Sequence, residues 1–177
     1  MRAVNKAQPR CAGPAGRECY VASANFSSLP LRQAAKNRLA MLFAGGRALV
    51  VAHIVGGQLK GFPELGVLKV YEVWPASGSL RKPAGVFRRL EDNGVRCVTT
   101  PCFSTRTIAL NTGRELNISD VDLSRTGVSA AERQRALTQI AQGRLIVSGQ
   151  IVVDRNAGPA GPGRTLVASQ FYVRAYP

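Results

Sequence analysis

Four cysteines are the residues of this chain whose types and spacing most directly suggest chemistry. Cys11 and Cys19 form one local pair, Cys97 and Cys102 form a second, and a long stretch without cysteine separates the two pairs. Short loops favour a disulfide within each pair over the two cross-connected arrangements. Zinc sites commonly place paired cysteines two residues apart, whereas these pairs enclose seven and four residues; free structural thiols are the other alternative. We therefore expect the disulfides Cys11–Cys19 and Cys97–Cys102.

The other side chains that could do chemistry have no evident partners. His53 is the only histidine and lies in an apolar segment, so we expect a packed, hydrogen-bonded side chain. Asp120 and Asp122 could act as paired carboxylates in a hydrolase or bind a cation, but their place just before a predicted helix favours capping. The sequence contains no nucleotide-binding loop and no nucleophile motif. We expect no catalytic residue, no metal and no cofactor.

The turn between the second pair of cysteines is the best candidate binding site. Its candidate residues are Arg96, Val98, Thr99, Thr100, Pro101 and Phe103. A disulfide across this turn would make it a rigid projection, which lowers the ordering cost of binding; the alternative is that the bridge only staples a hairpin. Trp74, the only tryptophan, is a further candidate as an interface anchor, with a place in the core as its alternative.

Composition limits the class of protein. The 177 residues include 24 Lys and Arg against 10 Asp and Glu, a net charge of +14, with 45% hydrophobic and only 19% charged residues. These fractions exclude a charge-rich disordered chain, and no apolar run is long enough for a membrane helix. Because the cations are spread along the chain, their field would attract nucleic acid or an anionic surface without reading a sequence.

An internal repeat organises the chain. A shift of 97 residues aligns residues 25–55 with 122–152 and gives nine identities in 31 positions, where ordinary composition gives on the order of two. The two halves each read as a helix followed by two strands. We expect two α+β repeats, residues 1–83 and 84–177, that form one pseudo-symmetric unit.

Local signals place the elements. Ser129 and Glu132 form a capping box and Gly143 a stop, which predicts a helix over 129–142. In the first half, an apolar stripe begins after Pro30 and ends at Gly45. Strands are predicted at 48–55, 67–74, 145–153 and 165–173.

Two further predictions concern strand pairing. Both faces of 48–55 are apolar, which predicts a central strand covered twice. Asp92-Asn93-Gly94 is a hairpin signal joining 86–90 to 95–98, and 111–113 marks another turn. The fold class is therefore α+β, with helices packed on antiparallel sheet.

The segment from Asn93 to Ser104, NGVRCVTTPCFS, resembles a signature of a domain family of exported bacterial proteins and lipoproteins. The resemblance covers most of the chain and implies export and disulfides, but the family has no assigned activity. The order of helix, strand, loop and strand is also similar to that of duplicated cystatin-type inhibitors. The QxVxG loop of that family is absent, so the likeness extends to the fold alone.

These features together favour an exported, non-enzymatic binding protein, inhibitor-like in form. It would display the loops around 56–63, 98–103 and 156–163 to a protein partner, in a periplasmic or extracellular location, its signal peptide lying outside this chain. The alternative location is the cytoplasm, with free thiols. The alternative function is a basic protein that binds nucleic acid or an anionic surface, which requires Arg32, Lys36, Arg133 and Arg135 to converge on one face.

Overall fold

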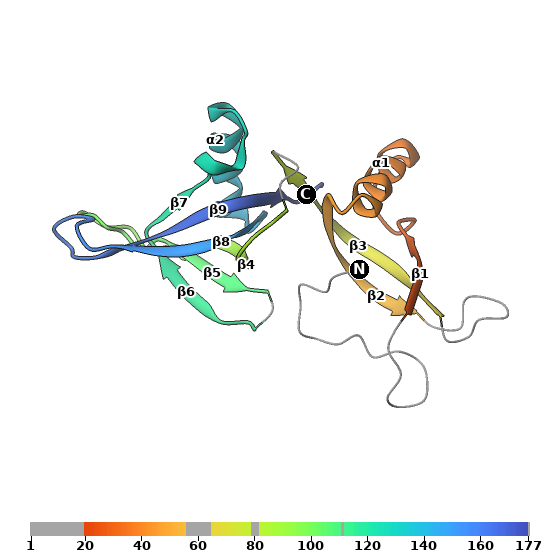
Figure 1. Ribbon diagram of the computed structural model, residues 1–177, viewed down its shortest axis with the longest axis horizontal. Coiled ribbons are helices and arrows are strands. Elements are labelled where there is room, and N and C mark those ends of the chain that lie inside the picture. The colour runs from red at the N-terminus through yellow and green to blue at the C-terminus, as the bar shows by residue number, and fades with distance from the viewer. Residues whose placement is uncertain (1–19, 56–64, 79–81, 111, 177) are drawn as a thin grey trace. The chain divides into compact units, whose positions relative to one another are not determined.

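The computed structural model describes residues 20–55, 65–78, 82–110 and 112–176, and these divide into two units. The N-terminal unit comprises 20–75 with 174–176, and the C-terminal unit comprises 76–173. The fold is α+β: in the described residues, two α-helices pack on a mixed nine-stranded sheet (Figure 1). None of the described helices is long and apolar enough to cross a membrane.

The N-terminal unit follows the order strand, helix, strand, strand. Its elements are β1 (Tyr20–Asn25), α1 (Gln33–Ala44), β2 (Ala48–Val55) and most of β3 (Leu65–Ser77). β1 runs parallel to β3, and β2 runs antiparallel to it. The expectation of a purely antiparallel sheet is therefore wrong, because the helical connection after β1 allows that strand to pair in parallel with β3.

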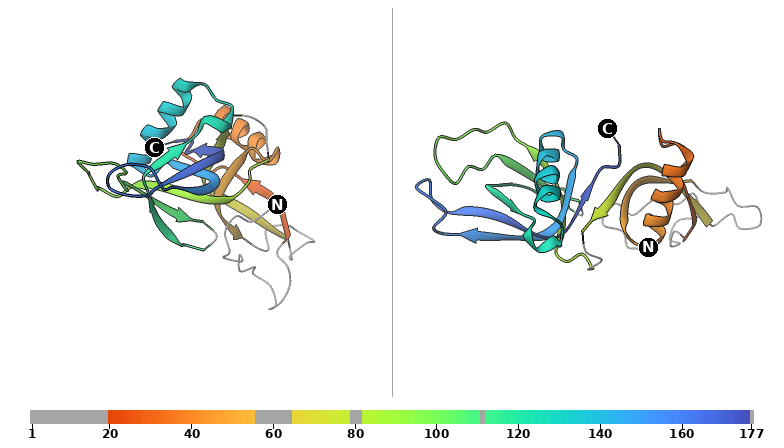
Figure 2. Two further views of the ribbon diagram at one scale, coloured as in Figure 1. Left: turned by 60° about the vertical axis from the view of Figure 1, so that its left-hand side comes forward. Right: turned by 90° about the horizontal axis from the view of Figure 1, so that it is seen from above.

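One helix covers one face of this small sheet. Leu39 of α1 packs with Ala48, Val70 and Val73 of the strands, and the two valines are fully buried. Figure 2 shows α1 lying across the strands. The helix ends where predicted, since Gly46 takes a φ of 69°, a conformation that favours glycine.

The position predicted for β2 is wrong in one respect. Its residues form the strand as expected, but among the described residues β2 pairs only with β3 and is not central. Val51 is 49% exposed. His53 is exposed rather than packed in the core, and its ring forms a T-shaped pair with the ring of Tyr71, with centroids 4.8 Å apart. An apolar sequence on both faces does not bury a strand when only one face has a helix against it.

The C-terminal unit repeats this order after a three-stranded addition. The addition consists of β4 (Val86–Asp92), β5 (Thr105–Ala109) and β6 (Glu115–Ile118). The remaining elements are β7 (Asp120–Asp122), the 3-10 turn η1 (Ser124–Thr126), α2 (Ala130–Thr138), the 3-10 turn η2 (Gln139–Gln142), β8 (Leu145–Asp154) and β9 (Gly163–Val173). β7 runs parallel to β9, while β8 runs antiparallel to both β9 and β4.

The ends of the second helix follow the sequence prediction. The Ser129 hydroxyl accepts a hydrogen bond from the Glu132 backbone N–H at 3.2 Å, and the Glu132 carboxylate accepts one from the Ser129 N–H at 3.0 Å. Gly143, with a φ of 63°, ends the last turn. The predicted helix 129–142 is confirmed, although its last turn is a 3-10 turn.

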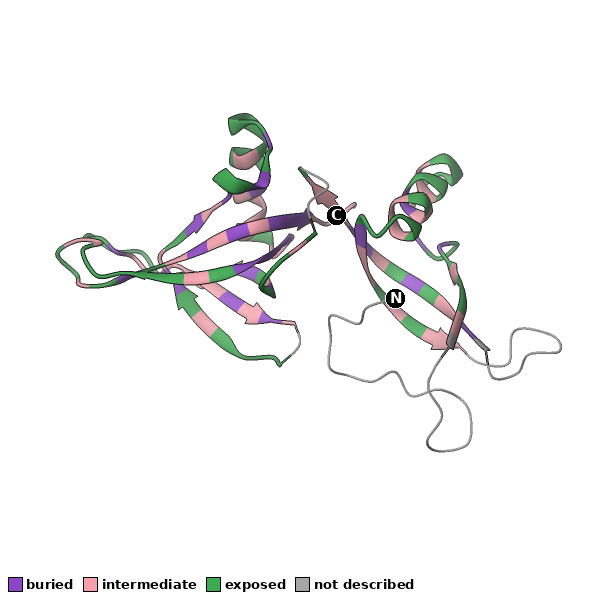
Figure 3. Ribbon diagram, viewed as in Figure 1, coloured by how far each residue is buried: buried purple, intermediate pink, exposed green. Residues whose placement is uncertain are grey.

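The first half of β8 is enclosed on both edges. Residues 145–149 lie between β4 and β9 and are all buried, as Figure 3 shows by colour. Leu145, Val147 and Phe171 form the centre of the core under α2. On the opposite side, the Ser148 hydroxyl donates to the carbonyl of Ala84 at 2.7 Å. This bond fastens the segment before β4 across the strand.

The predicted short hairpin at Asp92-Asn93-Gly94 is wrong. Gly94 does turn, with a φ of 79°, but residues 95–98 form no strand. β4 pairs instead with β5 at 105–109, across a loop of residues 93–104. Residues 95–104, which include the disulfide, belong to this loop, so the partner strand of β4 begins later in the sequence than the turn signal suggests. The predicted turn near Gly113 does connect β5 to β6.

Candidate functional site

The candidate site is the loop of residues 93–104 between β4 and β5, which we call the stapled loop. The predicted disulfide between Cys97 and Cys102 closes this loop, and the Cα atoms of the two cysteines lie 5.6 Å apart. The other predicted pair, Cys11 and Cys19, lies outside the described residues. The loop is therefore constrained covalently at its centre.

An ion pair fixes the first half of the stapled loop. The Arg96 guanidinium donates to both carboxylate oxygens of Asp92, at 3.0 and 2.6 Å. The Gly94 backbone N–H donates to the same carboxylate at 2.8 Å. The hydrogen bond from Arg96 and then that from Gly94 lower the pKa of Asp92 to about 2. Arg96, a predicted contact residue, thus has a structural partner within the loop's own base.

Hydrogen bonds close the second half of the loop. The Asn93 side-chain amide donates to the carbonyl of Phe103 at 2.8 Å, and its backbone N–H donates to the carbonyl of Ser104 at 3.0 Å. The Arg164 guanidinium lies 5.4 Å from the centre of the half-buried Phe103 ring. Phe103 therefore braces the loop against β9.

The connection between β8 and β9 packs against the stapled loop. The Ala160 N–H donates to the carbonyl of Thr100 at 2.9 Å. Gly158 lies so close to Thr100 that a side chain there would overlap its carbonyl oxygen. Two of the three loops expected to be displayed, 98–103 and 156–163, thus lie together. The third, 56–63, lies outside the described residues.

Exposure separates the predicted contact residues into two groups. Val98 is fully exposed, and Thr99 and Thr100 are also exposed. Pro101 was expected to project with them but is buried, following a cis peptide bond. Its side chain lies near Gly163 at the start of β9, so it anchors the loop. Val95, which is 44% exposed, is a further exposed apolar residue of this loop that the sequence reasoning did not name.

Trp74 does not belong to this site. It lies on β3 in the N-terminal unit and is only 3% exposed. Its indole N–H donates to the Glu72 carboxylate at 3.1 Å. This placement matches the alternative of a buried aromatic residue rather than an exposed anchor.

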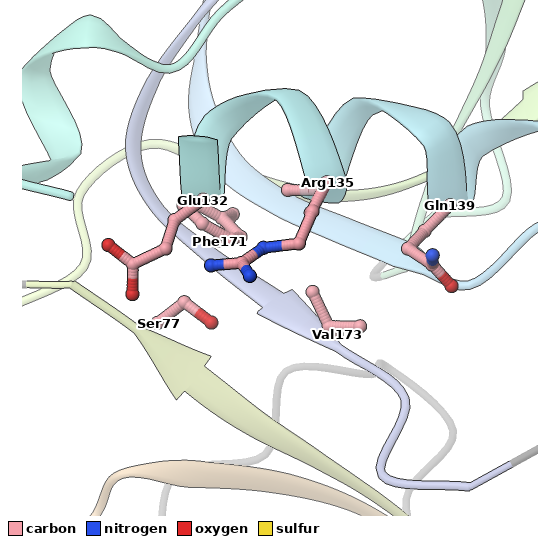
Figure 4. Close-up of a pocket in the computed structure, with 7 residues that line it drawn as sticks. Ser77, Glu132, Arg135, Gln139, Phe171 and Val173 are labelled. Carbon is pink, nitrogen blue, oxygen red and sulfur yellow. The ribbon is translucent and has the colours of Figure 1, made fainter. Parts of the chain in front are cut away.

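A hollow of about 290 Å³ lies elsewhere in the C-terminal unit, between α2 and β9 (Figure 4). Phe171 and Val173 line it on the sheet side, and the Arg135 side chain runs along the helix toward Glu132. The Glu132 carboxylate is already committed to the helix cap, because it accepts bonds from the Ser129 hydroxyl and N–H. Those bonds lower the pKa of Glu132. The hollow therefore offers one cation but no free acid.

The acidic candidates are engaged in local turns. The Asp122 carboxylate accepts the Ser124 N–H at 2.8 Å, and hydrogen bonds from Ser124 lower the pKa of Asp122. Asp120 accepts the adjacent Val121 N–H at 2.8 Å. In the described part of the chain, no three His, Cys, Asp or Glu side chains gather as a metal site would need.

The four cations proposed for an anionic partner divide between the two units. Lys36, in the N-terminal unit, donates to the carbonyl of Ser27 at 2.6 Å. Arg133, in the C-terminal unit, donates to the carbonyl of Val128 at 3.1 Å. Two of the four are therefore used in local contacts, and the convergence of Arg32, Lys36, Arg133 and Arg135 stays a prediction.

Comparison with known proteins places the chain in one family. All of residues 1–177 match the family described as Domain of unknown function (DUF6748), and the chain belongs to that family. No curated protein and no solved structure matches it.

Proposed function

We propose that this protein is an exported, non-enzymatic binding protein that presents the stapled loop to a protein partner. The observation that carries the proposal is the full exposure of Val98 in a loop that a disulfide closes. A disulfide, the Arg96–Asp92 ion pair and the bond from Ala160 to Thr100 all hold the loop in place. A loop ordered in advance loses little conformational entropy on binding.

The chemistry around the loop supports binding rather than catalysis. The carboxylates at its base accept hydrogen bonds from arginines: Asp92 from Arg96, and Glu91 from Arg89 and Arg106. The exposed side chains at the tip are valine and threonine, which supply apolar contact and hydroxyl groups. Such a surface fits a protein partner with a small apolar pocket. Inhibition of a protease is the specific form of this proposal that the cystatin-like order of elements suggests.

Export is part of the proposal. Disulfides persist in oxidising compartments and are rare in the cytosol. The Cys97–Cys102 bridge is therefore the feature that supports a periplasmic or extracellular location. The family likeness carried by residues 93–104 points the same way.

We also infer that the two units descend from one duplicated strand-helix-strand-strand element. In the N-terminal unit, β2 pairs with β3 from Ala48↔Pro75 to Val55↔Val67, with a bulge between Val51 and Ala52. In the C-terminal unit, β8 pairs with β9 in the same register, from Leu145↔Val173 to Val152↔Thr165. The bulge there lies between Ser148 and Gly149. Residues 145–152 of β8 each lie 97 positions after their counterparts in β2, and the two bulges fall at the same place in the register. Within the described residues, the stapled loop then belongs to strands, β4 and β5, that have no counterpart in the first copy.

The proposal is tested by comparative capture of partners. The wild-type protein, the variant Val98→Ala/Thr99→Ala/Thr100→Ala and a control variant Val152→Ala would serve as baits against the exported fraction of the source cell. The changed residues are all exposed, so the melting temperature should stay constant. We expect a protein retained by the wild type and the control and lost by the triple variant. Equal retention by all three baits would refute the proposal. Retention that vanishes at high salt for every bait would instead favour the anionic-partner alternative.

A further inference from the structure

β2 presents an edge that the corresponding strand of the C-terminal unit does not. The corresponding strand is β8, which lies 97 residues after β2 in the sequence. It pairs with β9 on one edge and with β4 on the other. β2 has β3 on one edge, and no described residue pairs with the other. Among the described residues, the N-terminal unit therefore has no strand at the position that β4 takes in the C-terminal unit.

The related unit also gives the direction and the space for an added strand. β4 lies antiparallel to β8 and pairs from Val86↔Gly149 to Leu90↔Leu145. It does so beside the helix formed by α2 and η2, which covers 130–142. α1 covers 33–44, and the span of α2 and η2 less 97 residues is 33–45, so the two helices correspond to within one residue. A helix in this position thus leaves room for an antiparallel strand at the neighbouring edge.

The residues of β2 include none of those that commonly protect an edge strand. Proteins usually block such edges with lysine, proline, inward charges or bulges. The segment Ala48–Val55, ALVVAHIV, contains no lysine, arginine, carboxylate or proline. The extra residue of the bulge is Tyr71 on β3, so β2 itself is regular. Val51 is 49% exposed on this strand.

We propose that β2 is the self-association surface of this protein, which pairs edge to edge and antiparallel with β2 of a second copy. An antiparallel pair of identical strands is self-complementary and closes with two-fold symmetry. The neutral strand lets two chains of charge +14 approach without like charges facing each other across the new pairs.

The register follows from the two faces of the strand. Ala48, Val50 and Ala52 pack toward α1, so they must meet residues on the same face of the second copy. Pairing centred on Val51 satisfies this, because it sets Ala48 opposite Ile54 and Val50 opposite Ala52. It also sets Val51 beside Val51 of the second copy, where side chains of directly opposed residues lie about 5 Å apart.

The test uses the full-length chain and two matched substitutions. Val51→Lys and Val152→Lys each charge a half-exposed strand valine, 49% and 51% exposed respectively. Sedimentation equilibrium over a range of protein concentrations measures the dimer dissociation constant. We expect the wild type to dimerise, Val51→Lys to weaken the dimer by about tenfold or more because two like charges oppose each other, and Val152→Lys to leave it unchanged.

A cross-linking experiment covers the case in which the lysine disturbs folding. Val51→Cys and Val152→Cys would be prepared separately in a chain with Cys11 and Cys19 replaced by serine. We expect mild oxidation to give a covalent dimer through position 51 and not through position 152. A wild type that stays monomeric at every concentration would overturn the proposal. A dimer that cross-links through position 152 alone, or survives Val51→Lys unchanged, would also overturn it.

Discussion

The two units share the order strand, helix, strand, strand and the register of their last two strands, but they differ in what surrounds β2 and its counterpart β8. β2 is the more apolar of the two corresponding strands, since β8 contains Ser148, Gly149 and Gln150. Nevertheless, residues 145–149 of β8 are all buried, whereas Val51 of β2 is half exposed. Burial here is set by the neighbouring strands, above all β4, and not by the hydrophobicity of the strand itself.

The largest effect in this comparison should come from Gly149. A side chain at this position would overlap the carbonyl oxygen of Val167, while the counterpart Ala52 holds its methyl group against the core of the N-terminal unit. We expect Gly149→Ala to lower the free energy of unfolding by about 2–3 kcal/mol. The reverse change, Ala52→Gly, should cost only about 0.5–1 kcal/mol. Chemical denaturation of both variants measures these free energies of unfolding. Equal losses in the two variants would contradict the claim that the close contact between Gly149 and Val167 makes the C-terminal position the more sensitive one.

Removal of the staple should have the next largest effect. The Cys97–Cys102 bridge has a sequence separation of only 5, so its loss should cost about 2 kcal/mol on the chain-entropy estimate. The variant Cys97→Ser/Cys102→Ser should therefore unfold earlier in denaturant than the wild type. It should also show faster amide exchange at Val98 and Thr99. Unchanged exchange would mean that the hydrogen bonds from Asn93 and Ala160 order the loop without the bridge.

The helix caps differ between the units and give a smaller effect. Ser129 caps α2, whereas its counterpart Arg32 makes no side-chain cap bond to α1. We expect Ser129→Ala to destabilise by about 1 kcal/mol and Arg32→Ser to stabilise by about 0.5–1 kcal/mol. Thermal unfolding of the two variants measures both changes. If Arg32→Ser instead lowers the stability, the serine hydroxyl does not accept a hydrogen bond from the backbone N–H groups in the first turn of α1.

The smallest effect concerns the pH dependence of the loop base. The folded-state pKa of Asp92 is lowered from 3.8 to about 2, chiefly by the hydrogen bond from Arg96. The stabilisation from the ionised carboxylate is therefore complete above the unfolded pKa and is lost as the pH falls through about 2. NMR titration of the Asp92 carboxyl should give a midpoint near 2 in the wild type. The midpoint should move toward 3.8 in Arg96→Ala, and an unmoved midpoint would contradict the ion pair.

Sequence reasoning succeeded where the signals are local. The capping box at Ser129 and Glu132, the stop at Gly143 and the short Cys97–Cys102 bridge each involve residues within five positions of one another or directly adjacent to a helix. Such contacts form largely without reference to the rest of the chain. The α+β class and the bounds of the main strands followed from the same kind of signal.

Sequence reasoning failed where distant segments decide the structure. Pro101 is buried because the start of β9, some sixty residues later, packs against it. β2 and His53 are more exposed than predicted because, among the described residues, only one face of β2 has a helix against it and only one edge has a paired strand. Neither the packing of β9 against Pro101 nor the surroundings of β2 can be recognised from the pattern of apolar residues within the segment itself. The stapled loop was found through its cysteines, but which of its residues face solvent required the structure.

The most direct test of the central claim is the affinity of the captured partner for the stapled loop. Isothermal titration would compare the wild type with Val98→Ala/Thr99→Ala/Thr100→Ala at equal folded fraction. A site centred on this loop predicts a loss of more than about 2 kcal/mol in binding free energy, the usual size of an interface hot spot, at an unchanged melting temperature. Equal affinities for the two proteins would contradict the claim and leave the loop as a structural staple.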